Sequence, residues 1–175
     1  MNVLVYWTQF KLKEWLVTLA ATEKGLCYVG MADDSVERLK DWLKRSDTEE
    51  LMEDETKLTV YISKLKEYFS GTITNFPTVS LDLKGTLFQQ QVWQALQQIP
   101  YGETRTYSNI AEHIGNVSSV RAVASAIGKN PVLIVVPCHR VIAKDGSLSG
   151  YRDGKDCKQS LLQLEKKSWV SDRTE

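Results

Sequence analysis

Cys138 is the residue of this chain that is best placed for nucleophilic chemistry, because it stands directly before His139 and Arg140 in the stretch PCHRV. A thiol is a good nucleophile as the thiolate, and the pKa of a free cysteine is about 8.5. An adjacent base or cation can lower that pKa. Each residue alone has a plain structural explanation, since a lone cysteine is more often core packing. Together they favour a reactive cysteine.

The segments on either side of Cys138 predict a pocket around it. VLIVV, residues 132–136, has the length and β-branched content of a buried strand, which Pro137 would end because it lacks a ladder N–H. After the cysteine, Asp145 and Gly146 predict a hairpin that pairs residue 143 with 148 and residue 141 with 150. The returning strand would bring SGYRDG, residues 149–154, beside the cysteine as a flexible pocket wall.

Residues 106–131, TYSNIAEHIGNVSSVRAVASAIGKNP, predict two helices joined by a short turn. Ser118 or Ser119 is the expected N-cap of the second helix. The face opposite its apolar stripe carries small residues between two cations, namely Arg121, Ala122, Ser125, Ala126 and Lys129. Small residues allow close approach to another surface, and cations suit phosphates. The pattern fits an internally packed helical hairpin or a helix-turn-helix against DNA.

The rest of the chain supplies the elements that would support these segments. Residues 1–80 predict a small α/β unit: a strand NVLVYW, a hairpin turning at TEKG, a helix SVERLKDWLKR, and a helix with Leu58, Ile62, Leu65 and Phe69 on one side. The acid-rich SDTEELMEDE, residues 46–55, is expected to be a solvated linker or helix face. A capping box at Thr86 and Gln89 opens a further helix in a second domain, residues 81–175.

Composition narrows the classes of protein. The 175 residues are 42% hydrophobic and carry 22 basic and 22 acidic residues, so the chain is globular and not a strongly basic binder. Three cysteines without a CxxC spacing argue against a disulfide framework or a cysteine-rich zinc site. The N-terminus shows neither a signal peptide nor a membrane span. These features predict a cytoplasmic protein with no membrane association.

The stretch NPVLIVVPCHRVIAKDGSLSGYRDG, with RAVASAIGKN before it and LLQLE after it, closely resembles the O6-alkylguanine-DNA alkyltransferase family. Members of this family take an alkyl group from a damaged guanine onto their own cysteine. The resemblance is strong over residues 85–166, and the first 80 residues match in layout. It implies an α/β fold, with a small ribonuclease-H-like N-terminal domain and a mainly helical C-terminal domain that contains a winged-helix-like helix-turn-helix.

The resemblance implies a catalytic role for five residues. Cys138 matches the alkyl acceptor, and His139 matches the base that deprotonates it through a water molecule. Glu165 matches the acid that orients the histidine. Asn130 matches the asparagine that ties the recognition helix to the active-site strand. Tyr107 matches the tyrosine whose hydroxyl donates to guanine N3 as the leaving group gains charge.

The resemblance also implies four DNA or substrate contacts. Arg121 matches the arginine that fills the gap left by the extruded nucleotide. The carbonyls of Cys138 and Val141 match those that accept from the exocyclic amine of guanine. Tyr151 and Arg152 occupy the loop that walls the pocket. A thiolate cannot reach O6 of a stacked, paired guanine, so the base must be flipped out.

The function implied is irreversible, single-turnover repair of O6-alkylguanine in double-stranded DNA by a monomer, with O4-alkylthymine as a second possible substrate. No cofactor is expected, and no zinc, since Cys27 is the one cysteine near the N-terminus and both histidines, His113 and His139, lie in the second half. One alternative is a non-catalytic protein that binds alkylated DNA. Another is a thiol hydrolase that uses Cys138, His139 and Glu165 and turns over repeatedly.

Overall fold

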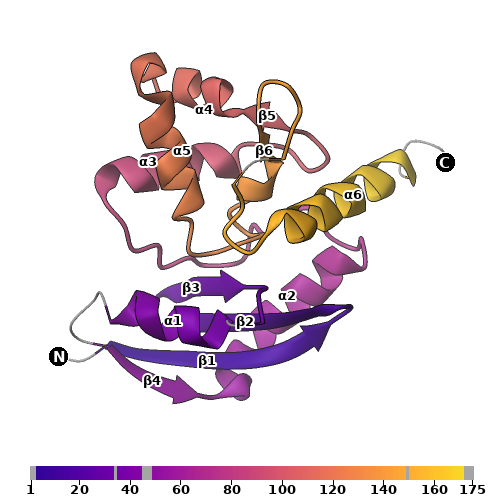
Figure 1. Ribbon diagram of the computed structural model, residues 1–175. Helices are drawn as coiled ribbons and strands as arrows, with labels where there is room; N and C mark the ends of the chain where they lie inside the picture. Colours follow the sequence, from indigo (N-terminus) through magenta and orange to yellow (C-terminus); the bar gives the residue numbers. More distant parts are fainter. Residues whose placement is uncertain (1–2, 34, 45–48, 149, 172–175) are drawn as a thin grey trace. The chain divides into compact units, whose positions relative to one another are not determined.

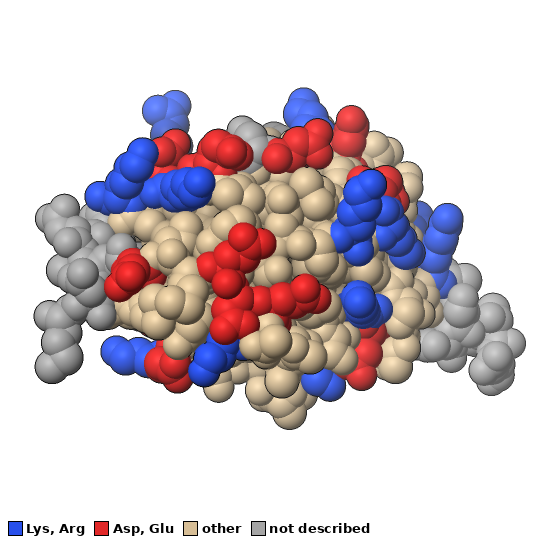
Figure 2. Space-filling view, turned by 90° about the horizontal axis from the view of Figure 1, so that it is seen from below, with Lys and Arg blue, Asp and Glu red and all other residues tan. Residues whose placement is uncertain are grey.

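The computed structural model describes residues 3–33, 35–44, 49–148 and 150–171. The chain divides into two compact units, residues 1–84 and residues 85–175, which are coloured indigo to magenta and magenta to yellow in Figure 1. On the face of the molecule drawn in Figure 2, acidic and basic side chains lie among one another. This mixture agrees with the formal net charge of zero.

A four-stranded sheet forms the base of the first unit, in the order β3-β2-β1-β4. The strands are β1 (Val3–Leu12), β2 (Trp15–Thr22), β3 (Gly25–Gly30) and β4 (Glu49–Glu53). β1, β2 and β3 are antiparallel neighbours, and Thr22 pairs with Gly25 across the turn at TEKG. The expected hairpin is therefore confirmed. Asn2, at the start of the expected first strand, lies outside the described residues.

The prediction of a solvated linker or helix face for residues 46–55 is wrong. Residues 49–53 form strand β4, which pairs in parallel with β1 at the edge of the sheet, and residues 46–48 lie outside the described part. Leu51 packs against the apolar cluster of this unit, while Glu50 and Glu53 are exposed. An edge strand needs few buried side chains, so it can carry many charged residues. The acidic composition of this segment therefore favoured a solvated linker over a strand.

Two helices complete the first unit, α1 (Ser35–Leu43) and α2 (Thr59–Phe69), with a 3-10 turn η1 (Glu55–Leu58) leading into α2. In Figure 1, α1 lies in front of the sheet and α2 behind it. The four apolar residues expected on one side of the second helix are all buried: Leu58, Ile62, Leu65 and Phe69. Arg45, at the end of the first expected helix, is outside the described residues.

The second unit is mainly helical. Its elements are α3 (Leu87–Gln97), β5 (Arg105–Thr106), α4 (Tyr107–His113), η2 (Val117–Ser119), α5 (Val120–Gly128), η3 (Cys138–Arg140), β6 (Val141–Ile142) and α6 (Lys155–Ser171). The Thr86 side chain accepts from the Gln89 N–H and the Gln89 side chain accepts from the Thr86 N–H, so the expected capping box is confirmed. No helix of the described residues is long and apolar enough to cross a membrane.

The expected buried strand at residues 132–136 is not a strand. The segment is buried except for the half-buried Val135. It closes on itself through hydrogen bonds from Val135 N–H to Leu133 O and from Val136 N–H to Val132 O, 2.8 and 3.1 Å. Ile134 has φ of 73°, a conformation that is costly for a β-branched residue. A short apolar run identifies burial but not the backbone conformation, which is why the strand prediction failed.

The expected hairpin after the cysteine forms only its turn. Gly146 N–H donates to Ala143 O and Ala143 N–H donates to Ser147 O, 2.9 and 3.1 Å, but no returning strand follows in the described residues. β6 pairs in parallel with β5 instead, with Arg105 opposite Val141 and Thr106 opposite Ile142. Ser149 lies outside the described residues. A local turn pattern cannot predict a pairing partner that lies 36 residues upstream.

α4 and α5 form the predicted helix-turn-helix, and Gly115 ends α4 with φ of 74°. Two details differ from expectation. Ser119 holds the N-cap position of α5 but makes no side-chain capping bond. Ala126 is buried rather than exposed, and its carbonyl accepts from the Trp93 indole N–H at 2.9 Å. The exposed face of α5 consists of Arg121, Ala122, Ser125, Gly128 and Lys129.

Candidate active site

Cys138 begins the 3-10 turn η3 and is 5% exposed. Burial raises the pKa of the Cys138 thiol, and the Asp153 carboxylate raises it further. A hydrogen bond from Asn130 and the charges of Arg152 and Lys158 lower it. Burial is the larger effect, so the resting thiol keeps its proton until a base removes it.

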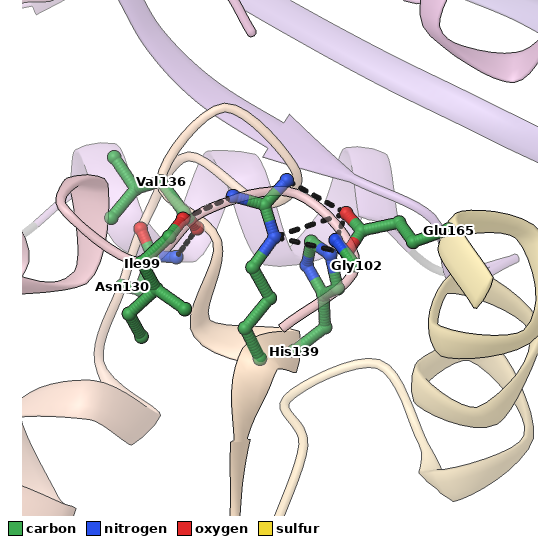
Figure 3. Close-up of polar contacts among 7 residues, drawn as sticks. Ile99, Gly102, Asn130, Val136, His139 and Glu165 are labelled. Atoms are coloured by element: carbon green, nitrogen blue, oxygen red, sulfur yellow. Dashed lines mark hydrogen bonds and ion pairs between the residues drawn. The ribbon is translucent and has the colours of Figure 1, made fainter. Parts of the chain in front are cut away.

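Asn130 fixes the shape of the turn that carries the cysteine. Its Nδ2 donates to Val136 O at 2.8 Å, as Figure 3 shows. Its Oδ1 accepts from Val132 N–H at 2.9 Å. Its own N–H donates to Ile127 O at the end of α5, 3.2 Å. Asn130 therefore connects α5 to the segment before Cys138, although that segment is a turn and not the expected strand.

His139 and Glu165 are in direct contact, as Figure 3 shows, with 2.7 Å between Nε2 and Oε1. His139 is fully buried, and burial lowers its pKa, as do the charges of Arg140 and Lys158, while Glu165 opposes this shift. The imidazole is therefore neutral at rest. A carboxylate can only accept, so Nε2 carries the proton and the lone pair lies on Nδ1. Nδ1 is buried and has no hydrogen-bond partner among the described residues.

Arg140 binds the same carboxylate as His139. Its Nη2 lies 2.7 Å from Glu165 Oε1, and its Nε lies 3.0 Å from Oε2. Burial alone would raise the pKa of Glu165, but the hydrogen bonds from His139 and Arg140, with the permanent charge of Arg140, lower it to about 2. The sequence suggested that the Arg140 charge would act on the thiol. The charges that lower the pKa of Cys138 belong instead to Arg152 and Lys158.

Lys158 is a buried cation that the sequence reasoning missed. Its side chain is 1% exposed, its Nζ donates to Val141 O, and burial lowers its pKa while Cys138 opposes that shift. Lys158 stands seven residues before Glu165 on α6, with the buried Leu161 between them on the same helical stripe. The sequence feature that could have predicted a buried lysine is its position on the same helical stripe as the apolar Leu161 and the candidate site residue Glu165.

The expected pocket wall is an ion-paired loop. Arg152 Nη1 donates to the carbonyls of Asn130 and Pro131, 3.0 and 3.2 Å, and Arg152 Nε lies 3.2 Å from Asp153 Oδ1. The Asp153 side chain is 0% exposed. Tyr151 is buried, with a hydroxyl that has no hydrogen-bond partner in the described part of the chain. The three side chains are close enough to Cys138 to act electrostatically with it.

The two remaining expected site residues belong to the helix-turn-helix. Tyr107 is the first residue of α4, follows β5 directly, and is half-buried. Arg121 is exposed on α5. The structure therefore gathers Cys138, Asn130, Arg152 and the His139–Glu165 pair into one cluster and leaves Arg121 on a surface. Among the residues that the structure describes, no three His, Cys, Asp or Glu side chains are grouped so as to hold a metal ion.

The buried thiol is followed by a histidine that contacts a carboxylate and is preceded in the chain by a helix-turn-helix. This combination fits the class of DNA-binding proteins that use a reactive cysteine. Residues 87–167 match the family model described as 6-O-methylguanine DNA methyltransferase, DNA binding domain, and residues 5–83 match its ribonuclease-like domain. The chain belongs to the methylated-DNA–protein-cysteine methyltransferase family. The family expected from the sequence is thereby confirmed, and with it the α/β fold.

Named relatives cover nearly the whole chain. The chain is 48% identical to the inducible methylated-DNA–protein-cysteine methyltransferase of Bacillus subtilis over 94% of this chain and 92% of the relative. It is 44% identical to the methyltransferase of Mycolicibacterium paratuberculosis, with 87% of each chain covered. The crystal structure of Mycobacterium tuberculosis O6-methylguanine methyltransferase superposes with a TM-score of 0.82 at 40% identity, covering 94% of both chains. A structure of the Mycobacterium tuberculosis protein in complex with DNA superposes with a TM-score of 0.77 at 39% identity, covering 93% of this chain and 94% of that one.

Proposed function

We propose that this protein repairs DNA by direct reversal, transferring the alkyl group of O6-alkylguanine in DNA to the sulfur of its own Cys138. The observation that carries the proposal is the fully buried His139, which contacts Glu165 at 2.7 Å and directly follows a buried thiol. Transfer to a cysteine is the activity in the names of the relatives that share 44–48% identity with the chain.

The first step forms the thiolate. The Cys138 proton passes to Nδ1 of His139, through a water molecule as in the family that the chain resembles. The resulting imidazolium is stabilised by Glu165, whose pKa of about 2 keeps it ionised. Lys158 and Arg152 offset the new negative charge on sulfur, because both already lower the pKa of Cys138. Cys138 is thus the nucleophile, His139 the base and Glu165 the acid that orients the base, as in a catalytic triad with sulfur in place of oxygen.

In the second step the thiolate attacks the alkyl carbon, and the bond between that carbon and O6 breaks. Its electron pair passes into the guanine, and the Tyr107 hydroxyl donates a hydrogen bond to N3 as that charge develops. The guanine anion then takes up one proton from water, which balances the proton that His139 accepted from Cys138 and returns to solvent. The carbonyls of Cys138 and Val141 accept from the exocyclic amine. These oxygens already accept from Val141 N–H and from Lys158 Nζ, and each has a second lone pair. The thioether has no route back to a thiol, so each molecule acts once.

DNA is the partner of this chain, and we propose that α5 is the element that enters it. The exposed face of α5 has small residues at Ala122, Ser125 and Gly128 between the cations Arg121 and Lys129. Such a face suits the minor groove, which is about 6 Å wide in B-DNA. Arg121 would fill the space of the extruded guanine, and the lesion weakens pairing and so lowers the cost of flipping. Base-specific sequence recognition is not expected.

The proposal extends to the organisation of the protein. Residues 1–80 and 81–175 would be the two domains of a monomer, with the chemistry and the DNA contacts in the second. O4-alkylthymine would be a poorer or absent substrate if the guanine amine contact to Val141 contributes to binding, since thymine has no amine at the matching position. The protein would act in the cytoplasm without a cofactor.

Intact-protein mass spectrometry tests the function directly. The protein is incubated with equimolar duplex DNA that contains one O6-methylguanine, and the site of any modification is found by peptide mapping. Repair predicts a gain of one methyl group per protein, on Cys138, with unmodified guanine left in the DNA. A lesion-binding protein would bind the duplex and stay unmodified. A hydrolase would convert an excess of substrate and also stay unmodified.

A further inference from the structure

Two segments far apart in sequence carry the two halves of the proposed chemistry. Residues 138–142 carry the thiol and histidine, and Tyr107 follows residues 99–106. The backbones of these segments pair through β5 and β6, where Arg105 lies opposite Val141 and Thr106 opposite Ile142. A parallel ladder of two residue pairs offers few hydrogen bonds, so it constrains the direction of the following helix weakly.

A second attachment lies a few residues upstream and is made by the Arg140 and Glu165 side chains. Arg140 Nη1 donates to Ile99 O at 2.7 Å, and Gly102 N–H donates to Glu165 Oε2 at 3.3 Å (Figure 3). The Arg140 guanidinium also lies 5.7 Å from the centre of the Tyr101 ring. The turn at residues 99–102 is therefore held by the same ion pair that orients His139.

The geometry of this attachment requires a guanidinium. Arg140 bridges both carboxylate oxygens of Glu165 and the carbonyl of Ile99 at once, and it is only 6% exposed. The planar fork of arginine provides several N–H groups in fixed directions, whereas a lysine offers one compact charge. Gly102 has φ of 81°, a left-handed conformation that an L side chain rarely adopts.

We propose that Arg140 is a positioning residue for Tyr107: by clamping the turn at residues 99–102 to Glu165, it sets where the tyrosine hydroxyl meets the guanine. The proposal rests on the function proposed above, in which the Tyr107 hydroxyl donates a hydrogen bond to N3 of the leaving guanine. Tyr107 stands five residues after Gly102, and β5 lies between them. A rotation of the turn would move the hydroxyl while Cys138 and His139 stay in place. Misplacement by about 1 Å costs up to about 100-fold in rate.

The test separates the two halves of the chemistry by using two reagents for the same sulfur. Methyl transfer from duplex DNA that contains O6-methylguanine needs both the thiolate and Tyr107. Alkylation of Cys138 by iodoacetamide needs the thiolate alone. Gly102→Ala strains the clamped turn and leaves the Arg140, Glu165 and His139 side chains intact. Gly71→Ala is the matched control, because Gly71 has φ of 78° and lies in the first unit.

We expect Gly102→Ala to slow methyl transfer by about 10- to 100-fold and to change iodoacetamide alkylation by less than about twofold. Gly71→Ala should change neither rate. The double variant Gly102→Ala/Tyr107→Phe should transfer methyl groups only slightly more slowly than either single variant, because both changes remove the same interaction of the Tyr107 hydroxyl with guanine. Arg140→Lys should resemble Gly102→Ala in methyl transfer, since the lysine cannot hold both Glu165 and the Ile99 carbonyl.

Three results would overturn the proposal. If Gly102→Ala slows methyl transfer and iodoacetamide alkylation equally, the contact between the turn and Glu165 affects the reactivity of the Cys138 thiol and not the position of Tyr107. Losses from Gly102→Ala and Tyr107→Phe that multiply would show that the two residues act independently. If Tyr107→Phe alone leaves transfer unchanged, the assigned role of Tyr107 fails and the positioning proposal falls with it. Failure of the repair function itself would be seen separately, as the absence of methyl transfer in the unaltered protein.

Discussion

Arg140 Nη2 and Glu165 Oε1 form a buried ion pair at 2.7 Å, and the same oxygen lies 2.7 Å from His139 Nε2. The Glu165 carboxylate thus has two roles: it neutralises the Arg140 charge and it orients the His139 ring. Arg140 supplies the permanent positive charge that keeps Glu165 ionised, so His139 need not be protonated at rest. The histidine is left neutral and oriented, which is the state that a base requires.

Glu165→Gln should lower both the transfer rate and the stability. The change leaves the Arg140 charge buried without its counter-ion, and breaking one side of a buried pair costs about 3–5 kcal/mol. Urea unfolding of both proteins at neutral pH measures this loss. A free energy of unfolding within about 1 kcal/mol of the unaltered protein would contradict the view that the pair is needed for stability.

The same pair predicts the direction of an acid effect. The pKa of Glu165 is about 2 in the folded chain, below the value of about 4.3 for an unfolded glutamate. A depressed pKa stabilises the fold above the unfolded value, and this contribution is lost as the pH falls from about 4.3 through about 2. Glu165→Gln should lack this part of the acid dependence. Unfolding curves that run parallel for the two proteins over that range would show that other groups are responsible.

Cys138→Ser should abolish methyl transfer and leave affinity for duplex DNA nearly unchanged, because the thiol is 5% exposed and does not contribute to phosphate contacts. Transfer is followed by mass spectrometry and binding by fluorescence anisotropy. Cys27→Ala is the control, since Cys27 is a buried cysteine of the first unit and should leave both measurements unchanged. A loss of DNA binding as large as the loss of transfer would assign Cys138 a structural role.

Arg121→Ala should slow repair in duplex DNA more than reaction with the free modified base. Arg121 is exposed on α5, and its proposed task is to stabilise the flipped state, which a free base does not need. Lys129→Ala removes a second cation from the same face and provides the comparison. Equal losses on the two substrates for Arg121→Ala would point to general electrostatic attraction.

Asp153→Gly should raise the rate with O6-benzylguanine by about tenfold or more and change methyl transfer little. The Asp153 carboxylate is fully buried against Arg152, and burying a bulky apolar group there requires displacing a charge. The measurement is the ratio of the two second-order rate constants. Asp153→Asn keeps the size and removes the charge, so it separates charge from bulk. If the unaltered protein already reacts readily with the benzyl compound, the Asp153 carboxylate does not limit the size of the alkyl group that Cys138 accepts.

Much of this protein could be predicted from local sequence. The hairpin at TEKG, the capping box of Thr86 and Gln89, and the apolar stripes of α2 and α5 depend on residues within a few positions of one another, so their patterns can be read directly. The residues of PCHRV indicated a reactive cysteine, and the longer stretch around them identified the family by resemblance. These signals decided the fold class and the acceptor cysteine.

The tertiary structure decided what depends on distant partners. Residues 132–136 became a turn because Asn130 satisfies their backbone groups, and β4 became a strand because β1 was available to pair with it. Arg140 could not be assigned from its neighbours, since its partners Ile99 and Glu165 lie 41 and 25 residues away. A sequence shows which charged side chains need a hydrogen-bond or ion-pair partner if they are buried. Which groups become those partners is decided by the tertiary structure, because they come from distant parts of the chain.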